Sequence, residues 1–295
     1  MKLVSLNQST DSFLSVEQVQ SYWNDGVVYP LTAISEREAA ELIPRFIELR
    51  DRMDGWVNCK QLLKVHLVSR WVYDLASSKR VLDAVEGILG PNILLWGATF
   101  FAKKPNHTFH VGWHQDLLYW GLKPADGVLT VWLGLTDASS DNGAMQVIRG
   151  SHTDGVRNHD NHFDANNMLM SSQNCEPTEE DLQNRMTCEL RAGQFSVHHG
   201  MTLHGSGPNL SDRPRIGLSI NYISTEVVQQ RNGGRDTAML VRGVDHYGHF
   251  ELESPPDFDF SEAAINQYRK SIVAPSGLAT LDDVPTSLVN LERIV

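Results

Sequence analysis

The chain has 295 residues, enough for one large or two small domains, and its apolar fraction of 41% is sufficient for a sizeable core. The formal net charge of −11 disfavours nucleic acid or an anionic membrane surface as the main partner. The cysteines Cys59, Cys175 and Cys188 form no CxxC pair, and the sequence shows neither an apolar leader nor a run of about 18 apolar residues. We therefore expect a reduced, soluble, cytoplasmic protein that binds neither nucleic acid nor a membrane.

The first part of the chain carries helical patterns. Residues 15–18 (SVEQ) and 35–38 (SERE) both match the capping box, in which the first and fourth side chains satisfy each other's free amides. Each box opens a segment with helical apolar spacing, and Pro44 predicts a kink in the second segment. A further helical stretch ends at Gly90-Pro91, a common terminator. Residues 1–90 are thus expected to form a mainly helical support.

From Asn92 onward the sequence changes to short runs that are rich in β-branched and aromatic residues and are separated by Gly, Asn, Asp and Pro. Such runs predict strands. Together with the preceding helices they predict a mainly β chain with flanking helices (α+β), whose core is a double-stranded β-helix, or jelly roll, of the cupin-like kind. The runs are ILLWGATFFA, VLTVWLGLTDA, GAMQVIRGS, GQFSVHH and RIGLSINYIS.

The domain organisation is expected to be simple, because the strand runs follow one another without a linker or an internal repeat. We predict a single domain over residues 1–295, with the jelly-roll core at 91–225. Within it, residues 153–187 are polar and rich in Asn and Asp, and loops of that length are usually functional or disordered. Residues 226–295 predict a strand, one helix near 261–270 and a polar tail.

The segment GWHQDLLYWGL, residues 112–122, places His114 and Asp116 among aromatic side chains. Alternate side chains of a strand share a face, so these two groups can point at the same spot inside a barrel. His-x-carboxylate is two thirds of the facial triad that holds non-haem Fe(II). The same pattern recurs at residues 152–154 and 162–164, where a turn and a solvated loop are the simpler interpretations.

Residues 198–222, HHGMTLHGSGPNLSDRPRIGLSINY, contain the candidates for a third ligand. His204 precedes Gly-Ser-Gly-Pro-Asn, a sequence that lets the backbone approach a site closely. His198 and His199 are alternatives, or are strand residues with satisfied hydrogen bonds. Arg215 follows within the next strand pattern, and a buried guanidinium there presents a planar fork suited to a carboxylate.

Three stretches in this order carry a family resemblance: His114-Gln-Asp116, then NGAMQVIRGSH at 142–152, then RAGQFSVHHGMTLHGSGPNLSDRPR at 191–215. They resemble the phytanoyl-CoA dioxygenase family of Fe(II)/2-oxoglutarate oxygenases, strongly over residues 90–225 and more loosely before that. The resemblance implies an enzyme that uses Fe(II), 2-oxoglutarate and O2 to hydroxylate a substrate, releasing succinate and CO2. It implies the iron ligands His114, Asp116 and His204.

The resemblance also implies a pocket for the cosubstrate. Two departures from the family pattern bear on local geometry: Arg149 replaces the proline usual before Gly-Ser-His, and Gln194 replaces an acidic residue. The implied cosubstrate residues are Arg215 for the distal carboxylate of 2-oxoglutarate, with Lys103 (or its neighbour Lys104), Trp132 and Ser206 around it.

The substrate is less defined by the sequence. A small polar metabolite is expected first: an amine, an amino acid, a phosphonate or a natural-product intermediate. An amino acid or acyl group tethered to a carrier protein is the alternative, and the oligomeric state is left open. The aromatic residues Trp96, Trp113, Tyr119 and Trp120 are candidate substrate contacts, suited to an apolar or cationic ligand, or else pack in the barrel core.

Two other classes of protein compete with an oxygenase. A non-catalytic cupin-like metal-binding module keeps the barrel but has no use for Arg215 at its spacing from a triad histidine. A zinc hydrolase needs a general base, and the HExxH motif is absent from the sequence. The sequence therefore favours the oxygenase.

Overall fold

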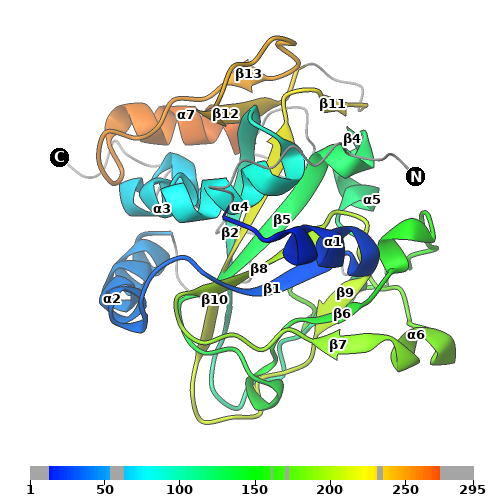
Figure 1. Cartoon of the computed structure of the whole chain (residues 1–295). Helices are drawn as coiled ribbons and strands as arrows, with labels where there is room; N and C mark the ends of the chain where they lie inside the picture. Colours follow the sequence, from blue (N-terminus) through cyan, green and yellow to red (C-terminus); the bar gives the residue numbers. More distant parts are fainter. Residues whose placement is uncertain (1–12, 54–62, 161, 170–172, 231–234, 273–295) are drawn as a thin grey trace.

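The computed structural model describes residues 13–53, 63–160, 162–169, 173–230 and 235–272. In this part of the chain two mainly antiparallel sheets form a jelly roll, as the sequence predicts (Figure 1). The large sheet has the order β1 (Val27–Thr32), β8 (Gln194–His199), β5 (Val128–Gly134), β10 (Arg215–Ser224), β2 (Ile93–Lys103), β12 (Thr237–Arg242) and β13 (Glu251–Leu252). The small sheet has the order β3 (Val111–His114), β9 (His204–Ser206), β6 (Gln146–Ile148) and β7 (Arg185–Thr187), and β4 (Leu122–Lys123) pairs separately with β11 (Val228–Gln229).

Helices cover one face of the large sheet, on the side away from the small sheet (Figure 1). Phe100 on β2 shows the packing: its ring lies 4.8 Å from that of Phe46 on α2 and 5.8 Å from that of Trp71 on α3. The main hydrophobic core thus lies between the helices and the outer face of the sheet. The helices are α1 (Val16–Asp25), α2 (Glu36–Arg52), α3 (Arg70–Ala76), α4 (Lys79–Leu89), α5 (Leu117–Trp120), α6 (Glu179–Gln183) and α7 (Glu262–Ile272), with 3-10 turns at Val65–Leu67, Ala125–Gly127, Ser140–Asn142 and Ser151–Thr153.

The predicted helix ends are confirmed. Ser15 and Ser35 cap α1 and α2, and both capping boxes are complete. The second helix continues through Pro44 to Arg52. Gly90 ends α4 with a φ of 84°, a left-handed value that favours glycine.

The pairing of β10 determines which side chains reach the interior. This strand lies between β2 and β5, with Ser219 opposite Thr99 on one side and Trp132 on the other. Successive side chains of a strand point to opposite faces. Consequently Arg215, Ser219 and Asn221 line the interior cavity, whereas Ile216, Leu218 and Ile220 pack into the helical core.

Outside the core the structure differs from the sequence expectations in detail. The stretch 153–187 contains α6 and ends in β7, which pairs with β6. The strand β1 went unpredicted because Pro30 interrupts its pattern; it lies at the edge of the sheet, where a missing amide donor is tolerated. The C-terminal helix is α7, and the polar tail lies outside the described residues. No helix among the described residues is long and apolar enough to cross a membrane.

A buried ion pair joins the helical layer to the C-terminal strands. The Nζ of Lys64 donates to Glu253 Oε1 at 2.9 Å and to Thr237 Oγ1 at 2.8 Å. Both partners of the pair are buried, and His66 Nε2 lies 3.5 Å from the second carboxylate oxygen. Burial alone raises the pKa of Glu253, but the charge of Lys64 and the contact with His66 outweigh it and lower the pKa to about 2.

Replacing Lys64 by Met leaves Glu253 buried without its cation. Breaking a buried pair from one side costs about 3–5 kcal/mol, so we expect Lys64→Met to lower the free energy of unfolding in urea by that order. The double variant Lys64→Met/Glu253→Met should recover part of the loss. Lys270→Met, which removes an exposed pair with Glu251, is the control and should change little. Equal losses in the single and double variants would contradict this role.

The same pair predicts an acid dependence. Because the pKa of Glu253 is depressed in the folded state, its contribution is present above its ordinary value of 4.5 and is lost as the pH falls towards 2. We expect Glu253→Gln to flatten the decline of unfolding free energy across this pH range. An unchanged slope would show that other carboxyl groups dominate acid unfolding.

Candidate functional site

Two histidines face each other across the pairing of β3 and β9. His114 is opposite His204, and their rings lie 4.1 Å apart. Asp116 completes the group, with Oδ1 3.3 Å from His114 Nε2 and 3.9 Å from His204 Nε2. One ligand atom from each residue lies within 4.8 Å of the others, the only group of this kind among the described residues. Two imidazoles and a carboxylate on one side of an ion match the donor set of non-haem Fe(II) and leave further positions open.

Backbone carbonyls orient the rings of both histidines. The Nδ1 of His114 donates to the Gly112 carbonyl and the Nδ1 of His204 to the Thr202 carbonyl, each at 2.9 Å. A carbonyl oxygen only accepts, so each Nδ1 carries a proton, and each Nε2 is turned towards Asp116, where it can bind a metal ion. Burial, followed by the nearby histidines, also holds the pKa of His204 well below its usual value, which keeps the ring neutral.

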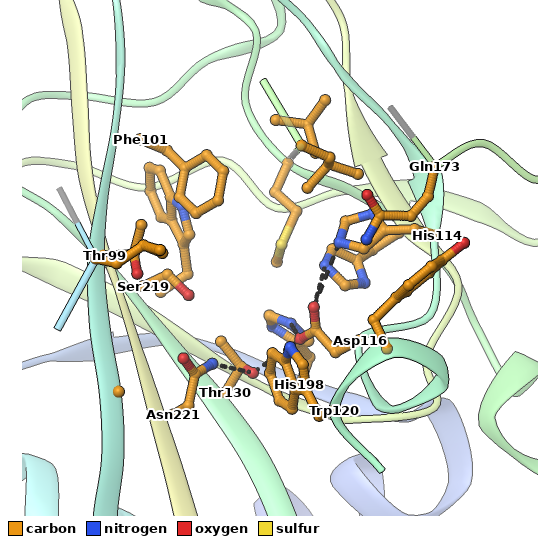
Figure 2. A pocket seen from close by; sticks show the side chains of 18 of the residues that line it. Thr99, Phe101, His114, Asp116, Trp120, Thr130, Gln173, His198, Ser219 and Asn221 are labelled. Atoms are coloured by element: carbon orange, nitrogen blue, oxygen red, sulfur yellow. Dashed lines mark hydrogen bonds and ion pairs between the residues drawn. The ribbon is translucent and has the colours of Figure 1, made fainter. Parts of the chain in front are cut away.

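Asp116 is held in its ionised form. Burial alone raises the pKa of this carboxyl, but the neighbouring His204, His114 and His198 outweigh burial and hold the pKa well below its ordinary value. Thr130 donates to Oδ2 at 2.9 Å and in turn accepts from the amide of Asn221 at 3.0 Å. Figure 2 shows Asp116 between His114 on one side and Thr130 with His198 on the other.

Asp116 lies beside His114 for a different reason from the one expected from the sequence. His114 is the last residue of β3, and Asp116 lies beyond it with helical angles (φ −53°, ψ −50°) where α5 begins. The strand alternation expected from the sequence is therefore wrong for Asp116; a turn brings its carboxylate back over the strand end. The other two His-x-Asp sequences behave as the simpler interpretation predicts: His152 contacts the Trp23 carbonyl, and His162 is exposed beside Asp160.

Arg215 is a buried cation in the same cavity. It is 2% exposed, and its Nε and Nη2 have no hydrogen-bond partner among the described residues. The guanidinium lies 5.2 Å from the ring centre of Trp132, and Gly217 opposite that ring leaves the space in which the indole lies. Burial lowers the pKa of Arg215 to about 9, so the group is still charged near neutral pH. A buried charge without a partner is costly, and a carboxylate ligand would satisfy it.

Lys103 is the lysine that faces the interior, whereas Lys104 is exposed. It lies opposite Arg215 in the β2–β10 pairing and donates to the hydroxyl of Ser206 at 2.6 Å and to the Gly207 carbonyl. Burial, and next the charge of Arg215, hold the pKa of Lys103 well below its usual value. Lys103 therefore holds Ser206, and an anion beside Arg215 would relieve the repulsion between the two basic groups.

The cavity around these groups has a volume of about 240 Å³. It reaches from Arg215 and Trp132 past the His-Asp-His group to an aromatic end. Leu169 and Gln173, both from the stretch 153–187, contribute to its wall. Two described residues of that stretch therefore border the site. Further lining residues are Trp96, Thr99, Phe101, Tyr119, Trp120, Thr130, Met145, His198, Ser206, Ser219 and Asn221.

The four aromatic candidates have different positions. Trp96, Tyr119 and Trp120 line the cavity, and the rings of the two tryptophans lie 5.0 Å apart. Trp113 points to the opposite side of β3 from His114 and packs against Ile148, Cys175 and Leu203. The expectation that Trp113 contacts substrate is therefore corrected by strand alternation.

Several polar groups of the site were not identified from the sequence. Thr130 and Asn221 lie two residues from Trp132 and Ser219, so counting along β5 and β10 from known interior positions would have found them. His198 was considered as a third ligand or as a strand residue with satisfied hydrogen bonds; it is not among the three residues whose ligand atoms converge, and neither of its ring nitrogens has a hydrogen-bond partner among the described residues. Gln173 lies in a stretch without strand periodicity, and no sequence signal identifies it. The departures at Arg149 and Gln194 lie outside the cavity lining.

Comparisons with known proteins agree with this geometry. A probable alpha-ketoglutarate-dependent hypophosphite dioxygenase from Stutzerimonas stutzeri is 29% identical over 251 residues, which cover 82% of this chain and 79% of that protein. Ectoine dioxygenase from Bordetella bronchiseptica is 24% identical over 237 residues, covering 72% and 76%. The solved structure of a non-heme monooxygenase, ThoJ, as a nickel complex superposes with a TM-score of 0.73 at 30% identity, covering 88% of this chain and 98% of that one.

The family model for phytanoyl-CoA dioxygenase (PhyH) matches residues 17–217, more than half of the chain. With the His-Asp-His group and an unpartnered arginine in one cavity, the cofactors implied by these relatives fit the residues present. The chain therefore belongs to the phytanoyl-CoA dioxygenase (PhyH) family and is an Fe(II)- and 2-oxoglutarate-dependent dioxygenase.

Proposed function

We propose that the protein hydroxylates a small polar metabolite. The reaction consumes the substrate R–H, 2-oxoglutarate and O2 and yields R–OH, succinate and CO2, which balances all atoms. The observation that carries the proposal is the buried Arg215, whose Nε and Nη2 have no hydrogen-bond partner in the part of the chain that the structure describes, in the cavity that also contains the triad. A metal-binding module without cosubstrate, or a hydrolase, would leave that cation without a partner.

The residues of the cavity take separate roles in this proposal. His114, Asp116 and His204 hold Fe(II), which, when bound with 2-oxoglutarate, supplies the oxidising chemistry. Arg215 binds the distal carboxylate of 2-oxoglutarate, with Trp132 and Ser206 beside it and Lys103 behind it. The stretch 153–187 excludes water through Leu169 and Gln173. These assignments rest on burial, free donor atoms and position in one cavity.

The substrate class follows from what remains of the cavity lining. Thr99, Ser219, Asn221 and Gln173 provide hydrogen-bonding groups, and the aromatic end provides ring faces that suit an apolar or cationic portion. The names of two relatives, a hypophosphite dioxygenase and an ectoine dioxygenase, also point to small molecules. An amine, an amino acid, a phosphonate or a natural-product intermediate fits this description.

A screen of such metabolites for substrate-stimulated succinate formation, with Fe(II), 2-oxoglutarate and O2, tests the proposal. A true substrate should raise succinate formation, and the amount of product that has gained one oxygen atom should equal the amount of succinate formed. If no compound of these classes stimulated turnover while a carrier-tethered amino acid did, the substrate class would be wrong.

The ligand assignment predicts which histidine variants lose bound iron. We expect His204→Ala to lose bound iron and turnover, because two ligands hold Fe(II) weakly. His152→Ala and His162→Ala should retain near-wild-type iron content, measured by elemental analysis after anaerobic loading and desalting. Loss of iron in either of these variants, with retention in His204→Ala, would refute the assignment.

The anchoring role predicts a selective effect of Arg215→Ala. Removing one partner of a buried charged contact costs about 2–5 kcal/mol, so the apparent KM for 2-oxoglutarate should rise by at least tenfold while the melting temperature changes little. Arg213→Ala is the control, since Arg213 is exposed and pairs with Asp141 at the surface. A large rise in the KM for 2-oxoglutarate in Arg213→Ala alone would assign the binding of the distal carboxylate to Arg213 instead of Arg215.

Asp116 predicts the outcome of the reaction. In halogenating members of the wider superfamily a small residue replaces this carboxylate and a halide takes its place. Because Asp116 fills that position here, we expect hydroxylation, or another oxidation that begins with hydrogen abstraction, even in chloride or bromide buffer. Mass spectrometry of product formed under ¹⁸O2 checks this, and a halogenated main product from the wild-type enzyme would overturn it.

A further inference from the structure

His198 is a buried polar side chain inside the cavity that the metal and cosubstrate roles do not use. It is 1% exposed, and neither Nδ1 nor Nε2 has a hydrogen-bond partner among the described residues. Desolvating an imidazole without compensation is unfavourable, and a phenyl ring would fill a similar volume at no such cost. A specific polar contact is therefore needed to account for a histidine here.

The polar contact available to His198 is Asp116. His198 lies beside Asp116 (Figure 2), with its Nε2 3.6 Å from Oδ2 of Asp116. The ring of His198 lies 4.5 Å from that of His204. This separation is longer than a hydrogen bond and within electrostatic range, and contacts in metal-free sites commonly tighten when the site is loaded. His198 is not one of the three residues whose ligand atoms converge.

The two oxygens of Asp116 have different surroundings. Oδ1 faces the Nε2 atoms of His114 and His204, whereas Oδ2 faces Thr130 and His198. Thr130 and His198 are direct partners across the β5–β8 pairing, so their side chains lie on the same face. The hydroxyl oxygen of Thr130 accepts a hydrogen bond from the side-chain amide of Asn221. The hydroxyl proton of Thr130 is therefore directed to Asp116.

We propose that His198 is a positioning residue, which with Thr130 holds Oδ2 of Asp116 so that Oδ1 alone binds the metal. A carboxylate free to turn would chelate through both oxygens and occupy a position that the cosubstrate or O2 requires. The donors on β5 and β8 prevent this turn because they come from two paired strands of the large sheet. The inference rests on the ligand assignment of the proposed function.

The test uses Co(II), an air-stable substitute for Fe(II), and three variants of the full chain. His198→Phe keeps the ring volume and removes both nitrogens, whereas His198→Gln retains a donor near the position of Nε2. His199→Phe, the same change one residue along β8 and on its other face, is the matched control. Co(II) affinity is measured by competition titration, and the carboxylate stretches of Asp116 by infrared difference spectra of ¹³C-aspartate-labelled protein with and without metal.

We expect His198→Phe to bind Co(II) about 10–100-fold more weakly, the usual effect of removing a group that orients a metal ligand. In this variant the frequency difference between the antisymmetric and symmetric stretches of the Asp116 carboxylate (the splitting) should become smaller, because a carboxylate that binds a metal through both oxygens has a smaller difference. His198→Gln should restore the wild-type splitting and most of the affinity, and His199→Phe should match wild type in both measurements whatever its melting temperature.

Wild-type splitting in His198→Phe would overturn the inference, as would loss of all binding in both His198 variants, which would make His198 a ligand itself. His114→Ala separates this result from failure of the proposed function. If His114→Ala loses Co(II) while His198→Phe binds Co(II) with the affinity and carboxylate splitting of wild type, the ligand set stands and the positioning role fails. If His114→Ala binds as wild type, the ligand set fails.

Discussion

The register of β10 between β2 and β5 is the constraint on which the site depends. Side chains alternate along a strand, so a slip of one residue would turn Arg215, Ser219 and Asn221 out of the cavity and bury their neighbours in their place. The apolar side chains on the opposite face oppose such a slip, because they pack under the helices. The hydrophobic core therefore determines where the charged groups lie, although it contacts none of the reacting atoms.

The cavity separates its charges along its length. One end has the cationic Arg215, and the anionic Asp116 lies farther along the cavity beside His114, His198 and His204. Each charge is supported by polar groups from strands, which are more rigid than loops. A metal cation and a dicarboxylate complement this arrangement, since each places the opposite charge beside a group that is already buried and oriented.

Much of the fold and of the site was predictable from the sequence, and the failures have physical reasons. Capping boxes and strand runs are local patterns, so the helices at Ser15 and Ser35 and the long strands β2, β5 and β10 were found. The grouping of His114, Asp116 and His204 was expected from motifs, but Asp116 reaches it through a turn rather than a strand. His198 was considered only as a ligand or as a strand residue with satisfied hydrogen bonds, because its position opposite Thr130 across the β5–β8 pairing is a non-local contact that no local pattern encodes. Gln173 lies in an irregular stretch whose path is set by tertiary packing.

Gly217 faces the ring of Trp132 and limits which residues this part of the site can contain. A Cβ atom at position 217 would overlap the indole, so every side chain other than glycine displaces the ring on which Arg215 lies. The Arg215 end of the cavity therefore does not tolerate a side chain at position 217 without movement of Trp132. The opposite end is lined by Trp96 of β2, by Tyr119 and Trp120 of α5, and by Leu169 and Gln173, and the last four residues lie outside the strands. Substitutions at those four positions can therefore change the lining of the cavity without altering the register of a sheet.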